Sequence, residues 1–190
     1  MDKPDTDNKG IFGFWLYLMT DLVMFAVLFA AFAVLRNNTF GGPELHKLFE
    51  NISFVLVETF ILLTSSFTCG VALICATYDK KAAMLSWLGA TFLLGTTFLV
   101  MELTEFSKLI HEGNGWQKSA SLSSFFALVG THGLHIAIGL LWLIILFVYV
   151  LKKGLGVHII KKLTLFSLFW HFLDLVWIFI FSMVYLLAHA

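Results

Sequence analysis

Five long apolar stretches leave this chain almost no choice of fold. They cover residues 11–35, 52–77, 83–106, 122–151 and 164–188. Each has 24 to 30 residues, whereas about 20 are enough for an α-helix to cross the roughly 30 Å hydrocarbon core of a bilayer. The connections between them are too short for a second domain. The sequence therefore predicts an all-α integral membrane bundle of five transmembrane helices, forming a single domain over residues 1–190.

The composition excludes a soluble chain and a nucleic-acid binder. Hydrophobic residues make up 59% of the chain and charged residues 13%, whereas a soluble domain carries roughly 25% charged residues. The 12 Lys and Arg residues are balanced by 12 Asp and Glu residues, so there is no basic excess for binding phosphate groups. No nucleic-acid partner is expected.

The basic residues predict the orientation of the helices. Eight lie in the N-terminal tail and in the second and fourth connections, on one side of the membrane. Four lie in the first and third connections, on the other side. The side with more basic residues is usually cytoplasmic. We therefore expect a cytoplasmic N-terminus and a C-terminus on the outer, periplasmic side.

Several ionisable residues fall inside the apolar stretches, where no Lys or Arg accompanies them. They are Asp21, Glu58, Glu102, Glu105, His132, His135, His171 and Asp174. An ionised carboxylate at the membrane centre costs roughly 2.5–3.5 kcal/mol or more, so such residues are usually functional or paired. The acids must be protonated, bonded to histidine or bound to a partner chain. These eight residues are the candidate site, with a possible role in proton or lipid binding.

Depth along the helices predicts which of these groups meet. Asp21 and Asp174 each lie ten residues from the cytoplasmic end of their stretch, so they fall at one level. Glu58 and Glu102 lie near the outer ends of the second and third stretches. We expect these two glutamates to share a hydrogen-bond network with a histidine of the fourth stretch, either His132 or His135.

Small residues predict close helix packing in the fourth stretch. Ala127, Gly130, Gly133 and Ala137 share one side of a helix, which lets another backbone approach. We expect this side to face other helices.

A metal, haem or catalytic site is the less favoured interpretation of the histidines. A metal ion needs three or four ligands with supporting contacts, and the Glu-x-x-His pairs of helical di-iron sites are absent. His171 and Asp174 resemble a supporting pair, but no nucleophile accompanies them. We predict no catalytic and no metal-binding residue; the acids either line a proton or ion path or brace the helices.

Three motifs resemble subunit III of the haem–copper terminal oxidases. The segments 125–135 (FFALVGTHGLH) and 169–177 (FWHFLDLVW) resemble the histidine helix and the last helix of that family, and the segment from Phe12 to Asp21 resembles its start. The likeness runs in order along nearly the whole chain. With Val57-Glu58-Thr59-Phe60 opening the second helix, the chain is most similar to the five-helix branch found in bacterial cytochrome o ubiquinol oxidases.

This resemblance implies an accessory, non-catalytic subunit of a proton-pumping ubiquinol oxidase in the bacterial cytoplasmic (inner) membrane. It implies partner subunits I, II and IV, haem and copper in subunit I and none in this chain, and ubiquinol acting on the complex. Family members support proton uptake and durability in subunit I, and bind phospholipid in a cleft between helices. Asp21 matches the family's intramembrane acid, and the other matched polar positions are Glu58, His132, His135, His171 and Asp174.

Two rival functions remain open. The electron donor binds other subunits in this family, so subunit III of a cytochrome c oxidase is the nearest alternative. The chain lacks the two N-terminal helices that wall the lipid cleft in the mitochondrial form, so the resemblance leaves that wall to another subunit. The second alternative is an independent ion-coupled carrier using Asp21, Glu58 and Glu102. Such carriers bind their substrate where transmembrane helices are broken, and none of the five stretches contains a proline that would break it.

Overall fold

Five long helices make up the part of the chain that the structure, a computed structural model, describes: residues 4–36, 38 and 52–186. They are α1 (Pro4–Leu35), α3 (Ile52–Thr77), α4 (Lys81–His111), α5 (Ala120–Lys153) and α6 (Val157–Ile180), which continues as the π-helical turn η1 (Phe181–Leu186). All five are long and apolar enough to cross a membrane. The predicted all-helical, five-span architecture is confirmed.

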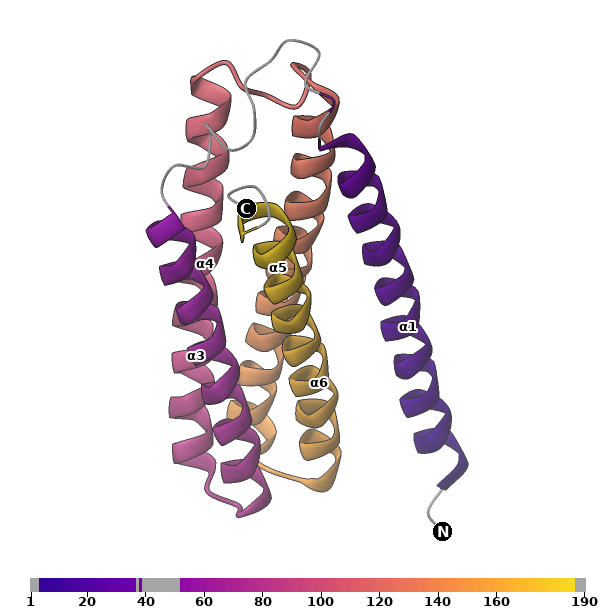
Figure 1. The fold of residues 1–190 in the computed structure, drawn as a ribbon. Helices are drawn as coiled ribbons and strands as arrows, with labels where there is room; N and C mark the ends of the chain where they lie inside the picture. The colour runs from indigo at the N-terminus through magenta and orange to yellow at the C-terminus, as the bar shows by residue number, and fades with distance from the viewer. Residues whose placement is uncertain (1–3, 37, 39–51, 187–190) are drawn as a thin grey trace.

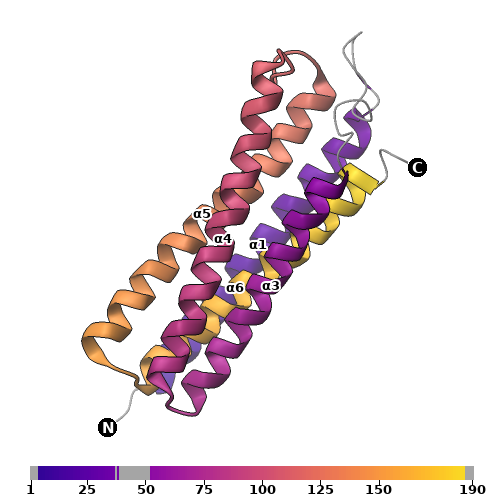
Figure 2. The ribbon, with the colours of Figure 1, turned by 90° about the vertical axis from the view of Figure 1, so that its left-hand side faces the viewer.

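Helix α6 lies at the centre of the arrangement (Figure 1). It packs against both α3 and α5, while α3 and α4 form an antiparallel hairpin. Helix α1 stands at the edge and packs mainly on α5. The start of α1 and the turn η1 lie at opposite ends of the elongated bundle, as an odd number of crossings requires (Figure 2).

Most helices extend beyond the predicted apolar stretches. The bounds of α3 agree with the prediction, but α6 begins at Val157, seven residues before the predicted start. The seven added residues include Lys161 and Lys162, and Nζ of Lys162 lies 4.9 Å from the ring centroid of Tyr149 on α5. Lysine keeps its stem on apolar surface while its charge reaches water, so a helix continues past the point where hydropathy falls.

Two tryptophans of α6 form the centre of the core. The indole N–H of Trp170 donates a hydrogen bond to Ser65 Oγ on α3 (3.1 Å), and that of Trp177 donates one to Thr59 Oγ1 (3.1 Å). A Cβ atom at Gly139 would lie 2.9 Å from the ring of Trp170. The side chains bury large apolar surfaces and also satisfy their one polar group, which ties α6 to α3.

The predicted small-residue side of α5 is only partly correct. Ala127 is exposed, and a Cβ at Gly130 would have only an ordinary contact of 3.6 Å with Phe106. The close approaches occur at Gly133, which belongs to the predicted side, and at Gly139, which does not. Helix α5 is contacted by α4 on one side and by the indole of Trp170 from α6 on another. The positions where a neighbouring helix comes closest therefore lie on different sides of α5.

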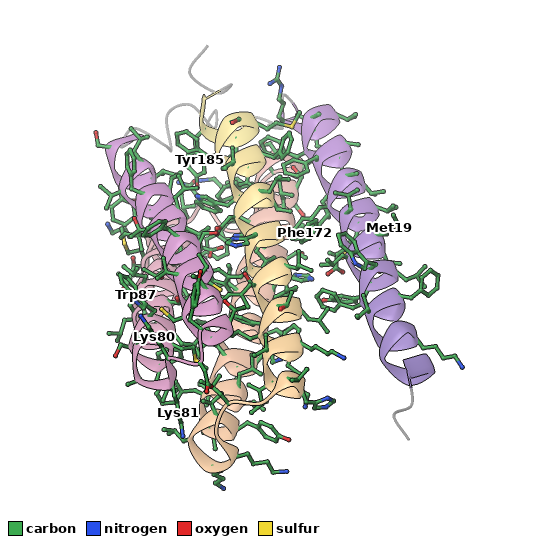
Figure 3. All side chains as sticks on the ribbon, turned by 90° about the horizontal axis from the view of Figure 1, so that it is seen from below. Met19, Lys80, Lys81, Trp87, Phe172 and Tyr185 are labelled. Atoms are coloured by element: carbon green, nitrogen blue, oxygen red, sulfur yellow. The ribbon has the colours of Figure 1, made fainter. Side chains whose placement is uncertain are left out.

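Helix α1 presents most of its surface outward. Among residues 9–35 of α1, the buried ones are Leu18, Asp21, Phe25 and Phe32. In the view from below, Met19 lies on the outer side of α1, whereas Phe172 reaches toward α1 from α6 (Figure 3). The helix is thus held to the rest of the bundle by one narrow face.

Some predicted features lie outside the described residues. They are the first connection between residues 39 and 51, the basic residues Lys3 and Lys47, and the end of the fifth stretch from residue 187. The lysine pair Lys80–Lys81 lies at the turn between α3 and α4, at the same end of the bundle as the start of α1 (Figures 1 and 3).

Candidate functional site: buried carboxyl and imidazole groups

Asp21 on α1 faces His135 on α5. The Oδ2 atom of Asp21 lies 3.7 Å from Nε2 of His135, and both side chains are buried. The other ring nitrogen, Nδ1, donates a hydrogen bond to the carbonyl of Thr131 (2.7 Å), because a carbonyl can only accept. Nε2 is therefore the nitrogen that faces the Asp21 carboxyl. Ring contact with Phe25 (5.4 Å between centroids) covers the imidazole.

Three glutamates gather between α3 and α4. Glu58 on α3 and Glu102 and Glu105 on α4 lie close enough for their carboxyl groups to interact electrostatically. Glu58 and Glu102 are almost completely buried. Tyr185 in η1 donates a long hydrogen bond of 3.4 Å to Oε2 of Glu105. Glu58 and Glu102 thus lie in one group, which also contains Glu105 and Tyr185.

The predicted hydrogen bonds between these glutamates and the α5 histidines are wrong. Neither oxygen of Glu58 or Glu102 and neither ring nitrogen of His132 has a hydrogen-bond partner in the described part of the chain. The neighbour of Glu102 on α5 is the backbone at Gly133. His132, one residue earlier and about 100° around the helix, turns into the core instead.

His132 is surrounded by aromatic rings. It stacks on Trp177 with a centroid distance of 5.3 Å and an interplanar angle of 27°. The ring of Phe98 lies perpendicular to the imidazole, with 6.1 Å between ring centroids, and the centroid of Phe25 lies 6.4 Å away. A completely buried imidazole in an aromatic cage is a packing element and has no bonded acid to exchange protons with.

His171 and Asp174 do not form the pair that their spacing predicts. Nδ1 of His171 is hydrogen-bonded to the Ser66 hydroxyl on α3, and the His171 side chain is exposed. Asp174 is buried near Cys69, and neither of its oxygens has a hydrogen-bond partner among the described residues. Asp174 therefore lies toward α3, whereas Asp21 has His135 as its neighbour.

The sequence interpretation missed the hydroxyl partners on α3. Thr59, Ser65 and Ser66 each contact a side chain of α6. The signal available in the sequence was the recurrence of hydroxyl residues near one side of a transmembrane helix, at intervals of six or seven residues. Such residues are common bridging groups between membrane helices.

The arrangement suits proton binding and helix packing more than metal binding. Within residues 4–36, 38 and 52–186, no group of three or more His, Cys, Asp or Glu side chains is placed to hold a metal ion. The Asp21–His135 pair places an acid and a base side by side across two helices.

Comparison with known proteins gives a consistent set of relatives. Residues 5–189 match the family described as cytochrome c oxidase subunit III. The chain is 51% identical to the cytochrome bo(3) ubiquinol oxidase subunit 3 of Pseudomonas aeruginosa, covering 97% of this chain and 88% of the relative. It is 43% identical to quinol oxidase subunit 3 of Bacillus subtilis (98% and 91% covered). It is 45% identical to cytochrome c oxidase subunit 3 of Bacillus sp. strain PS3 (95% and 86% covered).

Proposed function

The chain belongs to the cytochrome c oxidase subunit III family, the non-catalytic third subunit of haem–copper oxidases, and from this membership we propose that it serves an oxidase whose electron donor is ubiquinol. The single observation that carries the choice of donor is the 51% identity, over 97% of this chain, to a subunit named for a ubiquinol oxidase. The relative named for a cytochrome c oxidase is less similar, at 45%.

The chain is a multi-pass protein of the bacterial inner membrane, and its partners are other subunits of the oxidase. In the proposed complex these are subunits I, II and IV together with membrane phospholipids. Haem and copper belong to subunit I, and ubiquinol reacts with the complex and not with this chain.

The proposed orientation places the N-terminus in the cytoplasm and the C-terminus in the periplasm. Two groups of lysines lie at the end of the bundle where α1 begins: Lys80 and Lys81 in the α3–α4 turn, and the lysines around the α5–α6 turn (Figure 1). A basic end of a membrane bundle usually faces the cytoplasm.

The proposed contribution of this chain to the reaction is proton supply through α1. Asp21 is the buried acid of the helix that has the least contact with the rest of the bundle, and its neighbour His135 has one nitrogen available for a proton. In the assembled oxidase, the exposed apolar side of α1 would pack against subunit I. The Asp21–His135 pair would then hold a proton at the boundary between the two subunits.

An assay of the purified complex tests this function. Oxygen consumption is measured with a ubiquinol and, separately, with reduced cytochrome c as electron donor. We expect oxidation of the ubiquinol alone, and a shorter active lifetime in a complex prepared without this chain. Oxidation of cytochrome c by the complex would contradict the choice of donor. An unchanged lifetime without the chain would contradict the supporting role.

A further inference from the structure

His171 places an exposed imidazole at the middle of a membrane span. The span runs from Val157 to Tyr185, so His171 lies 14 residues, or about 21 Å, from either end. Its partner Ser66 lies near the middle of the span from Ser53 to Thr77. Ionisable side chains at this depth almost always face a bundle interior or a partner, because hydrocarbon offers them no hydrogen bonds.

Only one nitrogen of this imidazole has a hydrogen-bond partner among the described residues. Nδ1 is hydrogen-bonded to the Ser66 hydroxyl. Nε2 lies over Gly70 on α3, where a Cβ atom would be 4.0 Å away. No side chain or carbonyl of the described residues forms a hydrogen bond with Nε2. This nitrogen therefore requires a group from outside the described chain.

Exposed hydroxyl groups in the spans do not have this requirement. Thr64, Thr104 and Thr164 each donate to a backbone carbonyl three or four residues earlier in their own helix. The second nitrogen of His171 cannot bond to a carbonyl of its own helix in this way, because the hydrogen bond to Ser66 on the neighbouring helix fixes the orientation of the ring. The exposed polarity at His171 is thus distinct from that of the threonines.

The surface around His171 is apolar apart from hydroxyl groups and the imidazole itself. It consists of Leu63, Ser66, Phe67, Gly70 and Ile74 on α3 and Thr164, His171, Leu175 and Ile178 on α6, which we call the His171 face. It contains no Asp, Glu, Lys or Arg. Ser66 and Gly70 are the small residues of α3 on which the imidazole itself lies, which leaves the ring at the surface of this face. The two helices that carry the face, α3 and α6, pack side by side (Figure 1).

We infer that the His171 face docks a transmembrane helix of another oxidase subunit, which presents a hydrogen-bonding side chain to Nε2 at mid-membrane. This inference rests on the proposed function, since that function supplies the partner subunits. A lipid acyl chain would cover Leu175 and Phe67 but leave Nε2 unpaired. The family to which this chain belongs assembles with other oxidase subunits, so a helix of one of them is the occupant that we expect.

Photo-crosslinking in the purified complex tests the docking. A benzophenone amino acid replaces Leu175 or Phe67 in separate variants, and Leu93, an exposed residue of α4 outside the face, provides the control position. We expect Leu175 and Phe67 positions to crosslink to the same other oxidase subunit, identified by mass spectrometry, and the Leu93 position not to reach it. Adducts with lipid alone, or with a second copy of this chain, would overturn the inference.

A second measurement isolates the imidazole. In His171→Leu, the partner subunit should dissociate from the complex roughly tenfold faster in detergent, as expected for the loss of one intramembrane hydrogen bond. His171→Gln, which keeps a polar group, should restore part of the retention, and Thr64→Val should match the wild type. Equal dissociation of all variants would overturn the inference.

These outcomes separate the docking proposal from the proposed function. A haem-containing quinol oxidase whose His171 face crosslinks only to lipid contradicts the docking alone. Failure of the wild-type chain to purify with any haem-containing complex contradicts both.

Discussion

The carboxyl group of Glu102 on α4 lies against the backbone of α5 at Gly133, where a Cβ atom would come within 2.8 Å of Oε1. Both residues are buried. The absence of a side chain at Gly133 therefore provides the space that a buried carboxyl occupies, and this contact fixes how closely α4 and α5 approach.

Gly133→Ala should destabilise the protein by about 1–3 kcal/mol, the usual cost of overpacking a closed interior. The added methyl group forces the Glu102 carboxyl to move although it is almost completely buried. Thermal denaturation in detergent measures the effect. Gly130→Ala is the matched control, since its methyl would meet Phe106 at 3.6 Å. Shortening the acid in a Gly133→Ala/Glu102→Asp double variant should recover part of the loss; equal stability of the two glycine variants would contradict this account.

The indole of Trp170 occupies a slot between two glycines. Cβ atoms at Gly95 on α4 and Gly139 on α5 would each lie 2.9 Å from its ring. Because a buried ring cannot bend away, Gly95→Ala and Gly139→Ala should both lower the stability of the protein more than Gly133→Ala does. Trp170→Ala should cost about 3–5 kcal/mol through the cavity it leaves. Gly89→Ala, with open space around it, provides the control; similar melting temperatures for Gly89→Ala and Gly95→Ala would argue against the slot.

Ser65→Ala should weaken the contact between α3 and α6. The substitution leaves the buried N–H of Trp170 without an acceptor, which costs about 1–3 kcal/mol. Thr64→Ala is a suitable comparison, because the Thr64 hydroxyl is exposed and bonds to its own helix. Unfolding in detergent should separate the two variants clearly. A Ser65→Ala protein as stable as Thr64→Ala would show that the indole N–H finds another acceptor.

Asp21→Asn should shorten the active lifetime or slow the proton uptake of the oxidase while leaving assembly intact. Asparagine keeps the shape of the side chain but cannot accept a proton beside His135. Proton release and oxygen consumption are followed over many turnovers, with the yield of intact complex as the measure of assembly. Asp174→Asn, a buried acid that lies toward α3 instead, is the control. Wild-type pumping throughout by the Asp21→Asn enzyme would exclude a proton role for this residue.

The spans could be predicted from the sequence because hydropathy is a local property. The bounds of α3 agree to the residue, since polar positions border the apolar run at both ends. The early start of α6 could not be predicted in this way. The added segment 157–163, which carries Lys161 and Lys162, is helical because the lysine side chains extend along the surface, and hydropathy does not record that possibility.

The side-chain partners were harder to predict, because depth along a helix does not specify rotation about its axis. His132 and Gly133 differ by one residue and about 100°, so only one of them can face Glu102. The structure brings Gly133 to Glu102 and turns His132 toward Trp177. Likewise, the exposure of His171 depends on which helices flank α6, and no local pattern contains that information.

The most direct test of the central claim is to purify the tagged chain in mild detergent and record a reduced-minus-oxidised absorption spectrum beside a native gel. The account predicts haem absorbance in an assembly much larger than the 21.4 kDa chain, and no haem on the chain once it is dissociated from its partners. A colourless chain that migrates alone, or haem retained by the isolated chain, would contradict the assignment of an accessory oxidase subunit.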